Sequence, residues 1–258
     1  MHEFDAGPQG VFRQLCQDYP SGDVYTTGFR TKWGPIFYRG HVSGSARLLV
    51  IGQDPAQHEA FLRRILTGEA GRRVQGFVRK LGYTKHYVMV NTYLYGIYNQ
   101  KVAFQHANDP GIADYRHKWF DAILAPGKIE AVVAFGSQAH TAWQTYLATP
   151  SGQAISVAYA HVMHPTAPGK GNPIITTKTL LDNWNQGLQK LRPHITHPDI
   201  SEPFIPYGSD FTADELPEIP CQDLPAGIPD WMREGVAWAL MASDPGDQQA
   251  NITLKVPS

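Results

Sequence analysis

An apolar run that ends abruptly in polar residues is the feature that most constrains the fold of this chain. Residues 48–51 are Leu-Leu-Val-Ile, and Gly52, Gln53, Asp54 and Pro55 follow directly. Four apolar residues in succession are typical of a strand buried on both faces, as in a parallel sheet. Open α/β sheets bind ligands just beyond the carboxyl ends of such strands. The pattern therefore indicates either a catalytic acid at Asp54 or a carboxylate that caps the following helix.

Apolar runs alternate with helical patterns along the rest of the chain, which predicts an α/β fold. Further buried strands are expected over residues 87–91, 131–136 and 156–164. Helices are expected over residues 109–124, 137–147 and 180–191, and over residues 56–82 as one or two helices that break near residues 68–71. We predict a three-layer α/β/α sandwich around a four-stranded parallel sheet.

The net charge of −1 conceals a strong asymmetry between two parts of the chain. Residues 199–258 hold 11 acidic and two basic residues, a net charge of −9, so residues 1–198 carry +8. We predict a globular domain over residues 1–198 and an acidic, proline-rich extension over residues 199–258 that packs on its surface or is partly free. The positive excess gathers at Arg63, Arg64, Arg72, Arg73, Arg79, Lys80 and Lys85. These side chains either bind a polyanion such as DNA or form a solvated helix face.

Composition excludes several classes of protein. Cys16 and Cys221 are too few for a disulfide framework or a thiolate metal site. His161 and His164 lie three residues apart on an expected strand, where alternation turns them to opposite faces, so we expect no metal site. The sequence has neither a signal-peptide pattern nor a run of 18 apolar residues. We therefore expect a cytoplasmic protein that contacts no membrane.

The expected strands all end in polar residues or glycine. Asn91 ends the second strand, Gly136 and Ser137 follow the third, and His164 ends the fourth. The carboxyl ends of parallel strands meet at one edge of a sheet, so Asp54, Asn91 and His164 are expected to line one crevice. Considered one by one, Asn91 is a turn residue, His164 a framework residue and Ser137 a helix cap. Together, an amide, an acid and an imidazole suit recognition of a heterocyclic base with acid-assisted chemistry beside it.

Four motifs resemble those of the uracil-DNA glycosylase superfamily in order and spacing. They are GQDPA at residues 52–56, VMVNTYLY at 88–95, VVAFGSQA at 132–139 and HVMHPTAP at 161–168. The resemblance covers roughly residues 45–192. Residues 65–71 are similar to a loop of the thermostable bacterial and archaeal branch, whereas GQDP is similar to the classical branch. The chain thus resembles a divergent bacterial-type member, with residues 1–198 as its catalytic domain.

This resemblance implies a monofunctional glycosylase of base-excision repair that flips uracil out of DNA, hydrolyses its N-glycosidic bond and leaves an abasic site. Asp54 would position and polarise the attacking water and stabilise positive charge on the sugar. His164, the second catalytic residue, would donate a hydrogen bond to uracil O2. In the uracil pocket, Asn91 would read the base edge, Gln53 would offer its backbone N–H, and Gly52 would allow close approach. The implied partner is uracil-containing DNA, with no metal or organic cofactor, and we expect a monomer.

Two pocket positions depart from the pattern of the family. The classical branch follows GQDP with a tyrosine that excludes the methyl group of thymine, whereas this chain has Ala56. Gln57 or Tyr93 would then form that wall, or exclusion would be weaker. Leu66 matches the phenylalanine that stacks on the flipped base, a contact worth about 1–3 kcal/mol. Two phenylalanines are candidates to replace that stack, Phe61 and Phe77.

Contacts to the DNA backbone are expected from Thr166 and Lys170, in the loop after the His-Pro motif, and from Ser137. The loop has no large apolar side chain to fill the gap left by a flipped base, but its backbone amides and Lys170 can bind phosphates. A plain surface turn is the alternative interpretation of this loop.

Two other functions stay open at this point. A catalytically silent relative would bind nucleic acid through the basic face, and a small-molecule hydrolase would act on free nucleosides. The presence of the acid, the amide and the imidazole together favours the glycosylase.

Overall fold

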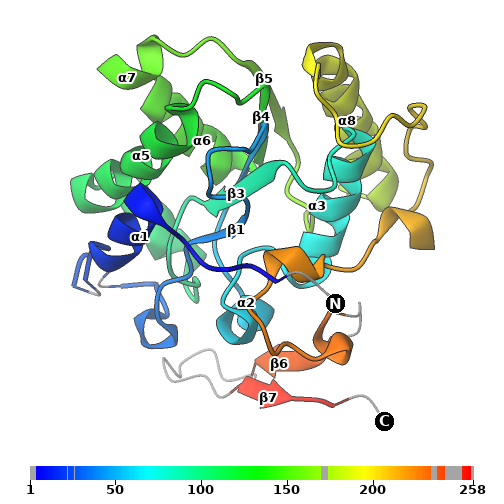
Figure 1. Ribbon diagram of the computed structural model, residues 1–258. Coiled ribbons are helices and arrows are strands. Elements are labelled where there is room, and N and C mark those ends of the chain that lie inside the picture. Colours follow the sequence, from blue (N-terminus) through cyan, green and yellow to red (C-terminus); the bar gives the residue numbers. More distant parts are fainter. Residues whose placement is uncertain are drawn as a thin grey trace.

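A five-stranded, mostly parallel sheet forms the centre of the computed structural model (Figure 1). The structure describes residues 4–21, 23–25, 27–169, 174–233, 237–241 and 252–256. The strand order is β1-β3-β2-β4-β5, with β1 at Tyr38–Gly40, β2 at Leu48–Gly52, β3 at Tyr87–Asn91, β4 at Ala131–Phe135 and β5 at Ala158–Val162. Neighbouring strands run parallel except β1 and β3, which are antiparallel.

The predicted α/β class is confirmed, and the four predicted strands are all present. The sheet has five strands rather than four, because β1 adds an antiparallel edge beside β3. This strand contains only three residues and includes Arg39, so it has no apolar run to predict it. The last predicted strand, residues 156–164, is shorter than expected because pairing with β4 ends at Val162. His164 therefore lies just beyond the sheet.

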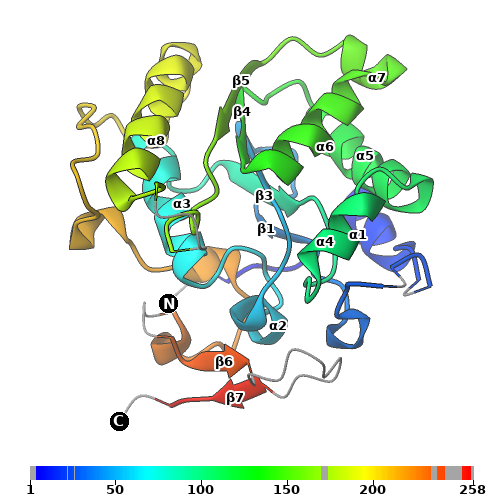
Figure 2. The ribbon, with the colours of Figure 1, turned by 180° about the vertical axis from the view of Figure 1, so that it is seen from behind.

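Alternate residues of the buried strands face two different helical layers. Leu49 and Ile51 pack in one apolar cluster, whereas Leu48 and Val50 pack in another. The first cluster includes side chains of three helices, α1 (Gly10–Gln17), α5 (Pro110–Leu124) and α6 (Ser137–Leu147). The second includes side chains of α3 (Glu69–Lys80) and α8 (Thr177–Leu191). Figures 1 and 2 show these two groups on opposite sides of the sheet, an arrangement compatible with a three-layer sandwich.

The predicted helices agree with the structure except at their ends. Residues 56–82 form two helices, α2 (Gln57–Leu62) and α3, and α8 begins at Thr177 rather than at residue 180. Ser137 was predicted to cap α6, but Gly136 is the N-cap and Ser137 is the first helical residue. Short elements complete the described chain: α4 (Gln100–Ala103), α7 (Pro150–Gln153), and the 3-10 turns η1 (Thr31–Trp33), η2 (Phe104–His106), η3 (Arg192–His194), η4 (Ala213–Glu215), η5 (Cys221–Asp223) and η6 (Asp230–Met232).

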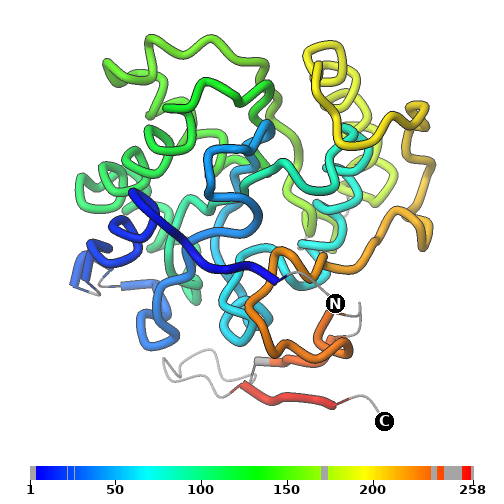
Figure 3. The backbone as a smooth tube through the Cα atoms, viewed as in Figure 1, coloured from blue at the N-terminus to red at the C-terminus, as the bar shows by residue number. Residues whose placement is uncertain are grey.

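The acidic extension lies against the basic face of α3. Figure 3 traces it from the end of α8 past α3 to the antiparallel strand pair of β6 (Ala239–Met241) and β7 (Ile252–Leu254). Arg79 pairs with Glu202 at 3.0 Å and Lys80 pairs with Glu215 at 2.8 Å. Arg72 donates to the backbone carbonyls of residues 216 and 217. The extension therefore supplies the anions that neutralise this face of α3.

The extension also reaches the centre of the molecule. Asp223 is fully buried, and its Oδ2 accepts a hydrogen bond from Tyr87 at 2.6 Å and lies 3.5 Å from Nε of Arg39. Nη1 of Arg39 in turn donates to the carbonyl of Leu66 at 2.7 Å. A buried charge is stable only when it is paired and hydrogen-bonded. Asp223 therefore ties the extension to β1 and to the segment before α3.

No helix in the described part of the chain is both long enough and apolar enough to cross a membrane.

Candidate functional site

Gly52, Asn91 and Leu66 converge at the carboxyl edge of the sheet. Gly52 and Asn91 are register partners at the ends of β2 and β3. A methyl group on Gly52 would overlap Oδ1 of Asn91 and lie 3.5 Å from Cδ1 of Leu66. Leu66 adopts a left-handed backbone with φ of 53°, which non-glycine residues rarely adopt. Three of the four residues predicted to bind uracil thus share one small space.

The amide of Asn91 is buried but bonds to nothing in the described residues. Asn91 is only 8% exposed, and neither its Oδ1 nor its Nδ2 has a hydrogen-bond partner among the described residues. Leaving buried polar groups unpaired costs about 1–3 kcal/mol, so such groups are uncommon in native proteins. An amide held in this state beside Gly52 can pair with a ligand that offers one donor and one acceptor.

Asp54 follows β2 and is oriented by the segment after β3. Its Oδ2 accepts a hydrogen bond from the backbone N–H of Ile97 at 3.0 Å, and its Oδ1 accepts one from Gln53 Nε2 at 3.0 Å. The helix-cap interpretation is wrong, because Ala56 is the N-cap of α2. Asp54 is half-buried, so a carboxylate with a fixed direction stands where water can reach it.

His164 is held beside the start of α6. Gly136 has a φ of 91°, which favours glycine, and a Cβ there would lie 3.2 Å from Cβ of His164. The imidazole Nδ1 accepts a hydrogen bond from the backbone N–H of Thr166 at 3.3 Å, and the Thr166 hydroxyl lies 3.0 Å from it. Because an N–H can only donate, Nδ1 is unprotonated and the proton of the neutral ring is on Nε2. Arg73 bonds the carbonyl of Pro165 at 2.7 Å and anchors this turn to α3.

The three predicted wall residues have different surroundings. Ala56 is exposed and Gln57 is half-buried at the first position of α2. Tyr93 is fully buried, and its hydroxyl donates to Gln138 at 3.0 Å. Burial raises the pKa of Tyr93, the positive charge of Arg116 opposes this rise, and the negative charge of Asp54 adds to it. Tyr93 therefore lies within electrostatic range of the carboxylate.

The two phenylalanines considered as replacements for Leu66 pack elsewhere. Phe77 is fully buried in α3, with its ring 5.2 Å from that of Phe135. Phe61 is 37% exposed and packs against Trp238 of the extension at 5.5 Å. Leu66 is thus the apolar side chain of the three that borders Gly52.

The residues predicted to contact DNA are only partly described. Ser137 is exposed at the start of α6, and Thr166 is half-buried against His164. Lys170 lies outside the described residues.

Most of the basic residues between positions 63 and 85 bond within the chain. Arg63 donates to the carbonyls of Trp33 and Pro35, and Arg64 pairs with Asp5. Arg72, Arg79 and Lys80 bind the extension, and Arg73 binds Pro165. The side chains of these arginines and of Lys80 thus have partners within the chain, although Arg63 and Arg79 are also exposed to solvent.

Sequence patterns did not single out Glu59, which supports the turn after Asp54. This residue is 5% exposed, and its Oε2 accepts a hydrogen bond from the Ala56 N–H at 2.9 Å. Its Oε1 accepts from the N–H of Thr67 at 2.7 Å and of Gly68 at 3.2 Å. The carboxylate thereby joins the turn of GQDPA to the segment that carries Leu66. An acid at the third helical position is the sequence signal that could have found it.

No group of three or more histidine, cysteine or acidic side chains in the described ranges is arranged to hold a metal ion. Two clefts of about 610 and 660 Å³ lie along the extension and the N-terminal segment, and none of Gly52, Asp54, Asn91 and His164 lines them. No protein-family model matches the chain, and no curated protein matches it either.

Proposed function

We propose that this protein is a uracil-DNA glycosylase that hydrolyses the N-glycosidic bond of a flipped uracil and leaves an abasic site. The observation that carries the proposal is the buried, unpaired amide of Asn91 between Gly52 and Leu66. A base in this space would satisfy the amide, and a free amide would otherwise be a net cost to the fold. The motif resemblance and the oriented carboxylate of Asp54 support the same function.

The amide accounts for a choice of uracil over cytosine. Nδ2 of Asn91 donates to uracil O4, and Oδ1 accepts from the N3–H of the base. Cytosine presents an amine in place of O4 and a bare N3, so both hydrogen bonds would be lost. In a closed site, unmatched polar groups give strong discrimination. Leu66 adds an apolar contact in place of an aromatic stack, so uracil is bound more weakly than on an aromatic ring.

The catalytic step assigns one role to Asp54 and another to His164. A water molecule oriented by Asp54 attacks C1′ of the deoxyribose, and its proton passes to the carboxylate. The C1′–N1 bond breaks, and its electron pair moves onto the uracil ring, where Nε2–H of His164 stabilises the charge at O2. A neutral imidazole is sufficient for this, in agreement with the hydrogen bond that Thr166 donates to Nδ1. The carboxylate also stabilises positive charge on the sugar.

The proposal is tested by incubating the purified protein with an oligonucleotide that carries one uracil and by detecting strand cleavage at abasic sites. We expect release without added metal and a loss of about 100-fold to 10,000-fold in rate for Asp54→Asn. Asp182→Asn is the matched control, because Asp182 is exposed and pairs with Lys178 on α8. Absence of release by the unmodified protein over a range of salt and pH would overturn the proposal.

Two further substrates separate the alternatives in the same assay. Free deoxyuridine hydrolysed faster than the oligonucleotide would indicate a nucleoside hydrolase. Salt-sensitive binding of the oligonucleotide without release would indicate a silent nucleic-acid-binding protein. A cytosine oligonucleotide serves to check the discrimination assigned to Asn91, and it should not be cleaved.

A further inference from the structure

Arg30 differs from every other arginine of the chain. All twelve arginines lie in the part that the structure describes, and eleven of them donate at least one side-chain hydrogen bond. The guanidinium of Arg30 makes no hydrogen bond and no ion pair there, although the residue is only 8% exposed. A desolvated, unpaired guanidinium is costly, and this cost calls for an explanation.

Two aromatic rings hold the Arg30 side chain in place. Its Cζ atom lies 4.9 Å from the centroid of Trp33 and 5.6 Å from that of Tyr98. The backbone N–H of Arg30 donates to the carbonyl of Gly96 at 2.7 Å, which fixes the start of η1 against the segment after β3. Nε and Nη1 are buried without a partner, whereas Nη2 is not among the buried atoms. The stacked guanidinium is thus pre-organised, with one nitrogen at the surface.

The position of Arg30 relates it to Asp54. Phe29 pairs with Ile97 in an isolated antiparallel bridge, and Ile97 donates the hydrogen bond to Asp54. Burial lowers the pKa of Arg30, whereas the phenol of Tyr98 and the negative charge of Asp54 act to raise it. The guanidinium therefore lies within electrostatic range of the carboxylate without being hydrogen-bonded to it. An anionic group that binds next to Asp54 would therefore lie close to the positive charge of Arg30.

We infer that Arg30 binds a phosphate of the DNA strand, next to the nucleotide whose base enters the pocket. The inference rests on the proposed function, since it takes DNA as the anionic ligand. Guanidinium groups stacked on aromatic rings are suited to phosphate recognition. Lys32, in the same turn, is exposed and makes no ion pair in the described residues, so it adds to the positive potential. By contrast, Arg79 and Lys80 of α3 are already paired with acidic residues of the extension.

The test measures binding of duplexes in which one phosphate at a time is replaced by an uncharged methylphosphonate. The target nucleotide is 2′-fluoro-deoxyuridine, whose electron-withdrawing fluorine slows bond cleavage during the measurement. For the unmodified protein, one linkage beside the target should lower the affinity about tenfold when it is neutral. Arg30→Met should bind the unmodified duplex about tenfold more weakly. Replacing the sensitive phosphate by methylphosphonate should then cause no further loss of affinity. The slope of log affinity against log salt should also decrease by about 0.9.

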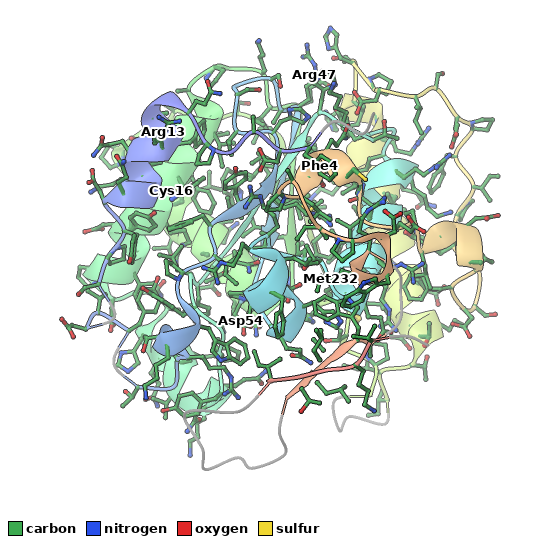
Figure 4. The ribbon with its side chains drawn as sticks, turned by 60° about the horizontal axis from the view of Figure 1, so that its bottom comes forward. Phe4, Arg13, Cys16, Arg47, Asp54 and Met232 are labelled. Atoms are coloured by element: carbon green, nitrogen blue, oxygen red, sulfur yellow. The ribbon has the colours of Figure 1, made fainter. Side chains whose placement is uncertain are left out.

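Arg13→Met is the matched control. Arg13 is exposed, donates only to the carbonyl of Pro8, and lies far from Asp54 in Figure 4. It should leave the affinity, the salt slope and the methylphosphonate profile unchanged. Arg30→Gln repeats the charge removal with a polar side chain, and thermal melting of both Arg30 variants verifies that they fold.

The outcomes separate this inference from the proposed function. If Arg30→Met and Arg30→Gln keep the sensitive linkage and the salt slope of the unmodified protein, the phosphate contact is refuted, even where uracil is released. If uracil is not released but the sensitive linkage disappears in both variants, the phosphate contact stands and the glycosylase proposal is refuted.

Discussion

The backbone N–H of Thr166 donates to Nδ1 of His164 at 3.3 Å, and this contact makes Nδ1 the acceptor nitrogen of the imidazole. A neutral ring whose Nδ1 accepts must present Nε2–H on its other side. The turn that makes this contact is anchored to α3 by Arg73 and to α8 by Trp184, which donates to the carbonyl of Met163 at 2.9 Å. The direction of the imidazole therefore depends on two helices of one layer.

His164→Ala should lower the rate of uracil release by about 100-fold to 1000-fold, as expected when one preorganised donor to a developing oxyanion is removed. Thr166→Val should have a smaller effect, because the backbone N–H still donates to Nδ1 and only the hydroxyl is lost. Single-turnover kinetics with a uracil-containing oligonucleotide measure the release rates of both variants. A ¹⁵N NMR spectrum showing a protonated Nδ1 in the unmodified protein would contradict this assignment.

Asn91→Leu should stabilise the protein while removing base recognition. The leucine side chain has a similar size and leaves no unpaired polar atoms, so the free energy of unfolding should rise by about 1–2 kcal/mol. Urea denaturation measures the stability, and release of uracil from the oligonucleotide should be lost in parallel. A less stable variant would mean that the amide has a partner in the folded protein.

Gly52→Ala should damage the pocket directly. The added methyl group overlaps Oδ1 of Asn91, so either β2 or the amide must shift. Overpacking of this kind costs about 1–3 kcal/mol of stability, and uracil release should fall because the amide no longer faces the base. Gly208→Ala is the control, since a methyl group there meets nothing within 4 Å. Equal activity in the two variants would show that the pocket is not at Gly52.

Asp223→Asn should change how stability depends on pH. Burial raises the pKa of Asp223 to about 6 from its ordinary value of 3.8, against the opposing charge of Arg39 and the hydrogen bond from Tyr87. Between about pH 4 and pH 6 the folded protein holds a proton that the unfolded chain has released, so stability falls as pH rises. The full fall is about 3 kcal/mol at 1.36 kcal/mol for each pKa unit.

The asparagine variant cannot titrate, and its stability should lack this fall. Urea denaturation at four pH values from 4 to 7 measures the difference. Asp182→Asn, in which an exposed ion pair is broken, should follow the unmodified protein throughout. A parallel decline of Asp223→Asn and the unmodified protein over this range would assign the pH dependence to other groups.

The positions of the site residues could be predicted because they depend on local pattern. Apolar runs ending at Gly52 and Asn91 determine where two buried strands stop, and parallel pairing brings those ends level. The edge strand β1 could not be predicted in this way, because its buried Arg39 is stabilised by Asp223, far along the chain. Nor does the sequence distinguish Arg30 from the other arginines. Its isolation results from tertiary packing alone.

Under the proposed function, the ion pairs between α3 and the extension influence how the protein encounters DNA. Opposite charges held a few ångströms apart cancel beyond about a Debye length, roughly 8 Å at physiological salt. The charges of Arg79 and Lys80 are thus balanced by acids of the same chain, which reduces the long-range attraction that would draw a duplex in from solution. If DNA is the substrate as proposed, its recognition depends on short-range contacts, so encounters with DNA should be less frequent than for a steered protein, and productive only where a base can leave the stack.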